Sequence, residues 1–207
     1  MVEQGPVLDG KLDDPCWKGL SVIKDFRQRR PNEGFAETEK TEVRLCRDAD
    51  FLFVGVRCFD SQPDQIRAGV MQRDAPVRGD DYFFILIDPF SRGRDGYYFR
   101  TNANGAKGEA LINSDMSRPK MDWDTIWEVR SQQDDLGWSA EFAIPFRSIP
   151  IDPDSDEWRI DFGRWISRGQ ERTKWVGYSR NRQWFSLEEA GQLTCLSDLN
   201  LVIGIDF

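Results

Sequence analysis

Histidine does not occur among the 207 residues of the chain. Because histidine is the commonest general base, the commonest metal ligand and the usual haem ligand, its absence counts against several catalytic and metal-dependent classes at once. No GxSxG, HExxH or phosphate-cradling loop occurs either, and a serine or cysteine nucleophile would lack its usual histidine partner. No motif singles out a catalytic pair among the 36 acidic residues. The sequence therefore favours a binding protein over an enzyme.

Cysteine is scarce, and its four positions lack the CxxC spacing of zinc and redox sites. The four are Cys16, Cys46, Cys58 and Cys195. They permit three disulfide pairings that the sequence cannot rank, and buried free thiols are the alternative interpretation.

Basic clusters and long apolar runs are also missing. The net charge of −8 argues against a nucleic-acid backbone as the main partner, because phosphate binding needs clustered Lys and Arg. The one basic run, Arg27 to Arg30, is short and is interpreted as a solvated loop beside Pro31, with a functional basic patch as the alternative. No stretch approaches the roughly 18 to 20 apolar residues of a membrane-spanning helix. No signal-peptide pattern opens the chain, and Met1 is compatible with a start after a removed export segment.

What is present is a rhythm of short strands with turns between them, and enough apolar residues, 39%, for a core. Alternation over residues 41 to 47, the turn Asp48 to Asp50 and the apolar run 51 to 59 predict a β-hairpin. The nearly continuous apolar run 82 to 88 predicts a central strand that is covered on both faces.

Further strands are predicted in the second half of the chain. Asn104-Gly105 favours a tight hairpin turn between residues 96 to 101 and 108 to 112. The other expected strands span residues 126 to 131, 138 to 144, 158 to 167 and 174 to 178. Helix is limited to single turns near residues 13 to 20 and 145 to 149. The prediction is one all-β domain, an antiparallel β-sandwich of immunoglobulin-like or jelly-roll-like architecture, and not a dinucleotide-binding fold.

The tryptophans divide into two groups by pattern. Trp17, Trp138 and Trp158 lie in alternating segments and are expected in the core. Trp184 lies in a polar stretch and is expected to be the most exposed.

The order of several motifs along the chain resembles the family 9 carbohydrate-binding modules. These motifs are Val7 to Trp17, Asp50 to Val54 with Asp60, Asp80 to Asp88, Gly137 to Pro145, and Gly191 to Leu193. The resemblance covers nearly the whole chain and implies a β-sandwich that binds carbohydrate. Such modules are often attached to glycoside hydrolases, which implies a role in carbohydrate catabolism.

A closer resemblance is to the family-9-like amino-terminal domain that precedes a predicted outer-membrane β-barrel in bacterial proteins of unassigned function. The matching motifs are Thr41 to Arg44, Arg73-Asp74, Asn102-x-x-Gly105, Trp123-Asp124-x-x-Trp127 and Gly137 to Phe146. This resemblance implies a domain over residues 1 to 198, with 199 to 207 starting a linker to a missing C-terminal barrel. It also implies a periplasmic or cell-surface location as part of an outer-membrane protein.

Family 9 modules clamp a terminal sugar between two tryptophans, helped by an arginine and a glutamate. Arg100 matches the arginine and Trp184 matches one tryptophan, while Asn102 lies on the same strand as Arg100. Arg100 is alternatively a strand arginine that pairs with a neighbouring acid.

The other half of the clamp departs from the pattern. The first tryptophan falls near Val77, and the glutamate falls at Phe83. Trp123 or Trp127 would then have to supply the second aromatic face.

The resemblance also implies structural calcium, held by oxygen ligands from acidic turns. The candidate ligands are Asp9, Asp13, Asp60, Asp80 and Asp81, and Asp88 lies in a similar turn. The alternative is that these aspartates cap solvated turns.

Three functional hypotheses follow. The first is a non-catalytic module of an envelope protein that stacks a glycan on Trp184 and hydrogen-bonds it through Arg100. The second is an interaction or plug-like domain of the attached barrel with no sugar ligand. The third is a haem-binding electron-transfer sandwich, in which the missing histidine leaves groups such as Met71 as axial ligands.

Overall fold

Two antiparallel β-sheets make up the computed structural model, which describes residues 1–113, 119–150 and 157–194. In the described residues, the larger sheet has the strand order β1-β10-β9-β4-β5-β6, with β11 paired to β9, and the smaller has the order β2-β3-β8-β7. The strands of the larger sheet are β1 (Arg27–Arg30), β4 (Tyr82–Asp88), β5 (Asp95–Asn102), β6 (Gly108–Asn113), β9 (Trp158–Ile166), β10 (Glu171–Lys174) and β11 (Gly191–Leu193). Those of the smaller sheet are β2 (Thr41–Arg47), β3 (Phe51–Phe59), β7 (Glu128–Asp134) and β8 (Gly137–Pro145).

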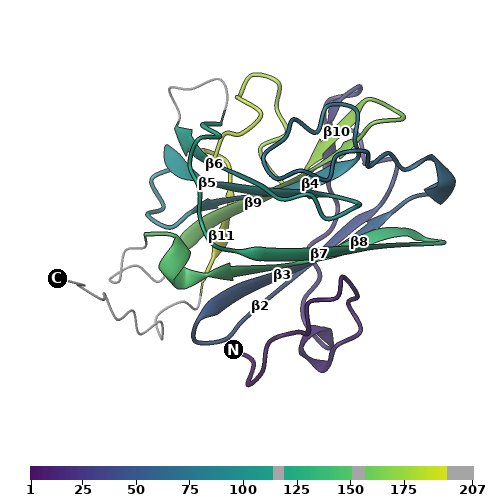
Figure 1. The fold of residues 1–207 in the computed structure, drawn as a ribbon. Helices are drawn as coiled ribbons and strands as arrows, with labels where there is room; N and C mark the ends of the chain where they lie inside the picture. Colours follow the sequence, from purple (N-terminus) through teal and green to yellow (C-terminus); the bar gives the residue numbers. More distant parts are fainter. Residues whose placement is uncertain (114–118, 151–156, 195–207) are drawn as a thin grey trace.

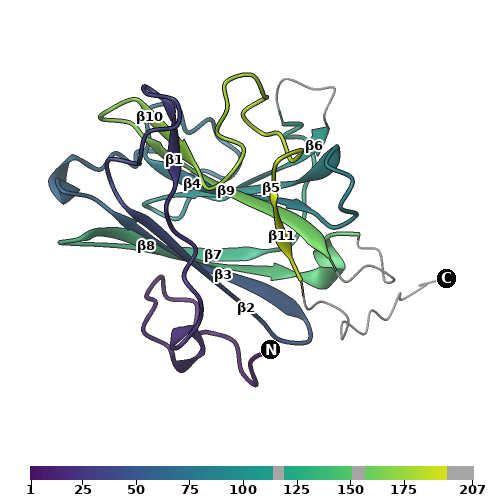
Figure 2. The same ribbon diagram turned by 180° about the vertical axis from the view of Figure 1, so that it is seen from behind.

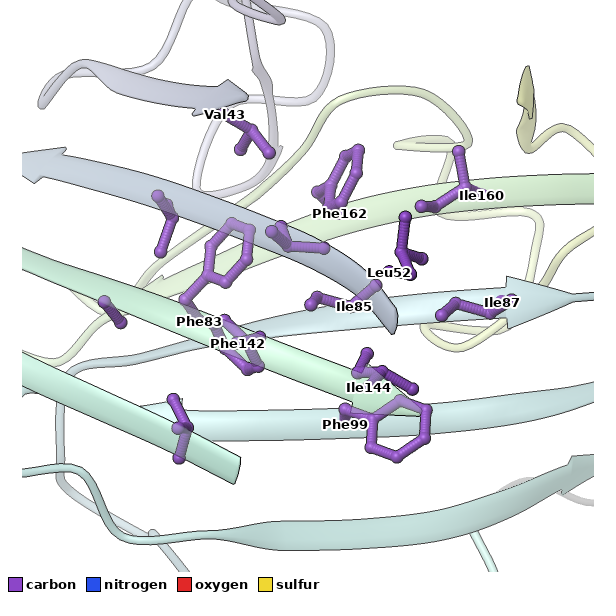
Figure 3. Close-up of a cluster of buried hydrophobic side chains, with 14 of the residues drawn as sticks. Val43, Leu52, Phe83, Ile85, Ile87, Phe99, Phe142, Ile144, Ile160 and Phe162 are labelled. Carbon is purple, nitrogen blue, oxygen red and sulfur yellow. The ribbon is translucent and has the colours of Figure 1, made fainter. Parts of the chain in front are cut away.

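The sheets pack face to face as two layers, with the larger sheet above the smaller in both views (Figures 1 and 2). The hydrophobic core fills the space between them. Figure 3 shows side chains from both layers, such as Phe83 and Phe162 of the larger sheet and Phe142 and Ile144 of the smaller, meeting in this space. The predicted antiparallel β-sandwich is confirmed.

Helix is confined to short 3-10 turns in the described residues. They are η1 (Pro15–Trp17), η2 (Pro63–Gln65) and η3 (Phe146–Ser148). The first and last lie where the sequence predicts single turns, and the second was not predicted. Within the same residues, no helix has the length and apolar character needed to cross a membrane.

The alternation along each strand decides which side chains enter the core. On β8, Trp138, Ala140, Phe142 and Ile144 all point inward, as predicted. The three tryptophans expected in the core are buried, with Trp17 packed on the far side of the smaller sheet rather than between the sheets.

Strand β4 is covered on both faces, as its apolar run predicts. Phe83, Ile85 and Ile87 enter the core, while Phe84 and Leu86 belong to a second apolar cluster on the opposite side of the larger sheet. We call that side, which faces away from the smaller sheet, the outer face. The segment 175–190 between β10 and β11 covers part of it (Figures 1 and 2).

The corresponding side of the smaller sheet is covered by the N-terminal segment, which lies below that sheet in Figure 1. Glu141 on β8 fixes it: its carboxylate accepts hydrogen bonds from the Asp9 and Gly10 amides at 3.0 and 2.9 Å and from Trp17 Nε1 at 2.8 Å. The two outer sides of the sandwich are therefore covered by different segments.

Two local expectations are wrong. Arg27 to Arg30 is an edge strand, β1, and not a solvated loop, because it pairs with β10 and buries Gln28, whose amide donates to Ala36 O at 2.8 Å. The strand expected at residues 174 to 178 ends at Lys174, since the amides of Trp175 and Val176 are taken by the Phe162 carbonyl and the Asp161 carboxylate.

The described cysteines are free thiols. Cys46 and Cys58 are buried, and burial raises the pKa of each to about 12, which keeps them protonated and unreactive. Cys195 and the expected linker 199–207 lie outside the described residues.

Candidate functional site

Aromatic rings and arginines gather on the outer face beside segment 175–190. The residues concerned, which we call the outer-face cluster, are Arg29, Tyr82, Arg100, Trp165, Arg172 and Trp184. They come from β1, β4, β5, β9, β10 and segment 175–190. Sheet pairing therefore assembles the cluster from positions far apart in the sequence.

Two glycines make room for large side chains in the middle of the sheet, Gly108 for Arg100 and Gly163 for Phe84. Strand register places Gly163, Phe84, Arg100 and Gly108 in one row across β9, β4, β5 and β6. A Cβ at Gly108 would lie 2.5 Å from Arg100 Nε, and one at Gly163 would lie 2.2 Å from the Phe84 ring. The two large side chains lie across space that a Cβ would fill.

The next row carries the aromatic surface. Arg172, Trp165 and Tyr82 are in register across β10, β9 and β4. The rings of Tyr82 and Trp165 have centroids 6.5 Å apart at 23°, and the Arg172 guanidinium lies 4.7 Å from the Trp165 centroid. A guanidinium at this distance from an indole makes a cation–π contact.

Trp184 closes the cluster from above the sheet. Its ring meets Phe84 edge to face at 5.3 Å, and the guanidiniums of Arg29 and Arg172 lie 5.9 and 5.8 Å from its centroid. The side chain is partly exposed, which agrees with its expected place at the surface.

The Tyr82 hydroxyl lies at the meeting point of these groups. Burial raises the pKa of Tyr82, while the charges of Arg172 and Arg100 and the neighbouring Trp184 indole act in the opposite direction. Burial likewise raises the pKa of Tyr98, which contacts Arg100 on β5. Both phenols are therefore neutral hydrogen-bonding groups at neutral pH.

A buried ion pair holds segment 175–190 to the sheet. Lys174 Nζ lies 2.6 Å from Asp161 Oδ2, and both side chains are fully buried. Asp161 Oδ1 also accepts the Val176 amide at 3.1 Å, and Lys174 Nζ donates to Ser186 O at 3.2 Å. The position of Trp184 therefore depends on charges beneath the segment that carries it.

A separate pocket of about 150 Å³ lies between the same segment and the end of β6. Phe185 and Gln183 line it from segment 175–190, and Ile112 lines it from β6. Neither Trp184 nor Arg100 lines it. The pocket offers one aromatic side chain, whereas the outer-face cluster offers three, so the cluster is the stronger candidate for stacking a sugar ring.

The structure brings Trp184 and Arg100 to one face of the sheet but places Trp123 and Trp127 on the other. Trp127 is 0% exposed and stacks on Phe142 between the sheets. Trp123 packs against Tyr97 and Phe99, which point into the sandwich. Both tryptophans therefore lie on the opposite side of the larger sheet from the cluster.

Asn102 is 0% exposed, and both ends of its amide are used internally. Its Nδ2 donates to Val70 O and Asp80 Oδ2, both at 2.8 Å, and its Oδ1 accepts the amides of Asn104 and Ala106. This side chain fixes the turn after β5 and has no free group for a ligand. Val77 and Phe83, which replace the family's tryptophan and glutamate, are buried.

The five aspartates predicted to bind calcium do not come together in the described residues. Asp9 and Asp13 are exposed in the N-terminal segment, whereas Asp60, Asp80 and Asp81 are buried elsewhere. The buried three accept backbone amides, from Gln62 for Asp60, from Gly69 and Val70 for Asp80, and from Arg67 and Ser167 for Asp81. Asp88 likewise accepts the amides of Phe90 and Gly93. A calcium site needs about six to eight oxygen ligands at one point, and these residues do not supply one.

A different acidic group, Asp74, Glu109 and Asp124, does converge in the described part of the chain. Arg73 occupies it: its Nε lies 3.5 Å from Asp74, and its Nη2 lies 3.0 Å from Asp124 and contacts Glu109. The Arg73 guanidinium thus already supplies the positive charge that a metal ion would bring to these three carboxylates. Met71, the axial candidate for haem, is 79% exposed and lies in no enclosed site.

The sequence analysis did not identify Arg29, Tyr82, Trp165 and Arg172. Tyr82 and Trp165 lie at the ends of strands whose apolar sequences predict burial. The two side chains meet because β4 pairs with β9. The signal in the sequence that could have indicated them is the alternation along a strand, which places every second side chain on the same face of the sheet.

No sequence-family model matches the chain, and no curated protein matches it. Several solved structures share its fold. One is a family 9 carbohydrate-binding module from Caldicellulosiruptor kristjanssonii in complex with cellotriose, with a TM-score of 0.63 and 17% identity over 96% of this chain and 94% of that chain.

A second structure, of a family 9 module from the same organism in complex with glucose, has a TM-score of 0.66 and 16% identity over 97% of this chain and 96% of that one. A third, of a proposed carbohydrate-binding protein from Bacteroides uniformis, has a TM-score of 0.67 and 13% identity over 85% of this chain and 86% of that one. The chain therefore has the β-sandwich fold of the family 9 carbohydrate-binding modules.

Proposed function

We propose that the protein is a non-catalytic carbohydrate-binding domain and that a glycan binds at the outer-face cluster. The observation that carries this proposal is the convergence of Trp184, Trp165 and Arg100 on one partly exposed face of the sheet. Aromatic rings stack on the apolar side of a sugar, and planar donors such as guanidinium bind its oxygen atoms at the edge. The family 9 fold, whose solved examples hold cellotriose and glucose, supports the same function.

The cluster differs from a clamp of two facing tryptophans. Its two partly exposed indoles are bridged by Arg172, whose guanidinium lies within 6 Å of both ring centroids. A sugar would therefore contact an aromatic and arginine surface rather than enter a slot between two rings.

The proposal is tested by isothermal titration calorimetry against cello-, xylo-, manno- and galacto-oligosaccharides and against uronic-acid and sulfated oligosaccharides. Trp184→Ala should weaken binding about ten-fold or more, since truncation of a central aromatic anchor typically costs more than about 1.4 kcal/mol. Trp123→Ala is the matched control, because Trp123 lies on the opposite side of the sheet. No binding across the panel, or equal affinities for the parent protein and Trp184→Ala, would reject the proposal.

We further propose that the domain works at the bacterial envelope and is attached to a C-terminal β-barrel. This rests on the motif order described above and not on the geometry of the site. Fractionation of cells that express the full-length protein, followed by protease protection of the intact envelope, tests it. Recovery of the protein in the cytoplasmic fraction would reject it.

A further inference from the structure

We propose that the outer-face cluster selects anionic glycans, that is, sugar chains with carboxylate or sulfate groups, through Arg29, Arg100 and Arg172. This inference rests on the proposed glycan-binding function and narrows its ligand class. It follows from how the three guanidiniums are held, which of their N–H groups are free, and where the surrounding carboxylates point.

Two indole rings hold Arg172, and none of its N–H groups has an acceptor in the described residues. Its guanidinium lies over the rings of Trp165 and Trp184 at 4.7 and 5.8 Å from their centroids. Such contacts use the flat face of a guanidinium, whereas its five N–H donors lie in its plane. A planar donor edge of this kind matches the two oxygens of a carboxylate or sulfate group.

Donors are left without acceptors at this point. Arg172 Nε and Arg100 Nε are both buried and have no hydrogen-bond partner. Arg100, which is 9% exposed, donates through Nη2 to Ala75 O at 2.8 Å. Arg29 donates to backbone carbonyls of Ser179, Arg180 and Arg182. Buried donors without partners are costly, so the cluster is poised to accept an oxygen-rich ligand.

Within the described ranges Arg29, Arg100 and Arg172 form no ion pair, although Glu33 acts electrostatically on Arg29, and Asp74 and Arg100 act on each other in the same way. Acids that lie near segment 175–190 are engaged elsewhere: Glu33 lies 3.7 Å from Arg180, and Glu189 lies 3.6 Å from Arg182. In this part of the chain Arg100 makes no direct ion pair with a neighbouring acid, and Asp74 acts on it only electrostatically.

The arginines also repel one another. Burial lowers the pKa of Arg29 most. Glu33 is the strongest charge acting on it and raises the pKa, while the neighbouring charges of Arg172, Arg30 and Arg180 each lower it. This local positive charge exists in a protein whose net charge is −8. A bound anion would relieve the repulsion, whereas a neutral sugar would bury the same charges without compensating them.

The test compares matched acidic and neutral ligands by calorimetry. Oligomers of galacturonic, glucuronic and mannuronic acid are paired with their methyl esters, which keep the sugar ring but lose the charge, and sulfated oligosaccharides form a third arm. The acidic form should bind about ten-fold or more tightly than its ester, the difference expected of a charge-assisted bidentate contact. Raising the salt concentration from about 0.1 to 1 M should weaken the acidic form alone, because the Debye length falls from about 10 to 3 Å.

Two variants locate the effect. Arg172→Gln should remove most of the preference for the acidic form, and Arg172→Lys should restore it only in part, since a lysine keeps the charge but loses the planar donor edge. Arg44→Gln, which removes an arginine paired with Glu42 on the smaller sheet, is the control and should change nothing. Thermal unfolding checks that each variant is folded.

The possible outcomes separate the two proposals. Equal or tighter binding of the neutral forms, with loss of binding in Trp184→Ala, would overturn anion selection and leave glycan binding intact. A preference for acidic forms that Arg172→Gln leaves unchanged would also overturn it. Failure of every acidic and neutral glycan to bind would overturn the glycan-binding function itself.

Discussion

Arginine has two distinct uses among the residues of this protein. Arg164 is fully buried at the core side of β9, where its guanidinium donates to the carbonyls of Glu39, Lys40 and Phe59 and so joins the two sheets. Arg172, on the outer side of the neighbouring strand, lies over indole rings and has no such acceptors. The first is a structural crosslink, and the second presents donors to a ligand.

The first residue-scale prediction concerns Gly108, which makes room for Arg100. Gly108→Ala would place a Cβ 2.5 Å from Arg100 Nε and 3.1 Å from its Cγ, so the whole side chain must move. Glycan affinity should fall about five-fold or more, the effect of misplacing one charged hydrogen-bonding group. Gly169→Ala is the control, because its nearest neighbour would lie 4.0 Å away. Calorimetry that finds equal affinities for both variants would contradict this role of Arg100.

The second residue-scale prediction concerns pH. Burial raises the pKa of Glu37 from 4.5 to about 7, although hydrogen bonds from Thr41 and the charge of Arg164 act against the rise. Between pH 4.5 and 7 the folded state therefore keeps a proton that the unfolded state has lost, and the free energy of unfolding should fall as pH rises through this window. Solvent screening of this half-buried group limits the loss to at most about 2 kcal/mol.

Urea unfolding from pH 4 to 8 measures this effect, and Glu37→Gln should remove the slope that Glu37 contributes. Glu42→Gln is the control with the opposite sign. A hydrogen bond from Lys40 lowers the pKa of Glu42, so its contribution to stability is present at neutral pH and lost on acidification. Identical pH profiles for the parent and Glu37→Gln would refute the assignment.

Single residues were predicted unevenly from the sequence. Arg100 and Trp184 were found because their motifs match the family order, and both lie on the outer face. Trp127 belongs to an equally good motif but enters the core, because its ring stacks on Phe142 of the opposing sheet. A motif alone does not show which side of a sheet a residue occupies.

At the scale of elements, segment 175–190 is the part of the fold on which the site depends. It has little regular structure of its own, and the Asp161–Lys174 pair and the packing of Phe185 and Leu187 against Tyr98 and Phe84 hold it on the sheet. Loss of the ion pair should therefore displace Trp184.

Lys174→Met tests this coupling. It leaves the carboxylate of Asp161 buried without its partner and should lower the free energy of unfolding by about 3 to 5 kcal/mol. The double variant Asp161→Asn/Lys174→Met removes the stranded charge and should recover much of this loss. Lys11→Met is the control, since Lys11 forms an exposed pair with Asp9 and should contribute less than about 1 kcal/mol. Urea unfolding that shows an equal loss in the single and double variants would contradict the role of the ion pair.

The elements themselves were largely predictable, because hairpins are local. The hairpin of β2 and β3 and that of β5 and β6 follow from alternation and turn residues. The edge strand β1 and the early end of β10 were not predicted, since each depends on hydrogen bonds to residues more than a hundred positions away or to a side chain beneath the strand.

At the scale of the whole molecule, the sandwich has two unlike outer sides. The N-terminal segment closes the smaller sheet through Glu141 and Trp17, whereas segment 175–190 covers the larger sheet only in part. Beside this segment lie aromatic rings and arginines that form no ion pair in the described residues, in a protein that is otherwise acidic. This asymmetry is why we place the ligand on the larger sheet.

The most direct test of that placement is an NMR titration of the 15N-labelled protein with the glycan that binds most tightly in the calorimetric panel. We predict that the shifted amides and indole N–H signals belong to the outer-face cluster, with Trp165 and Trp184 foremost, and that the N-terminal segment and Trp123 are unaffected. Shifts centred on the smaller sheet or on Trp123, with none at Trp165 and Trp184, would contradict the account.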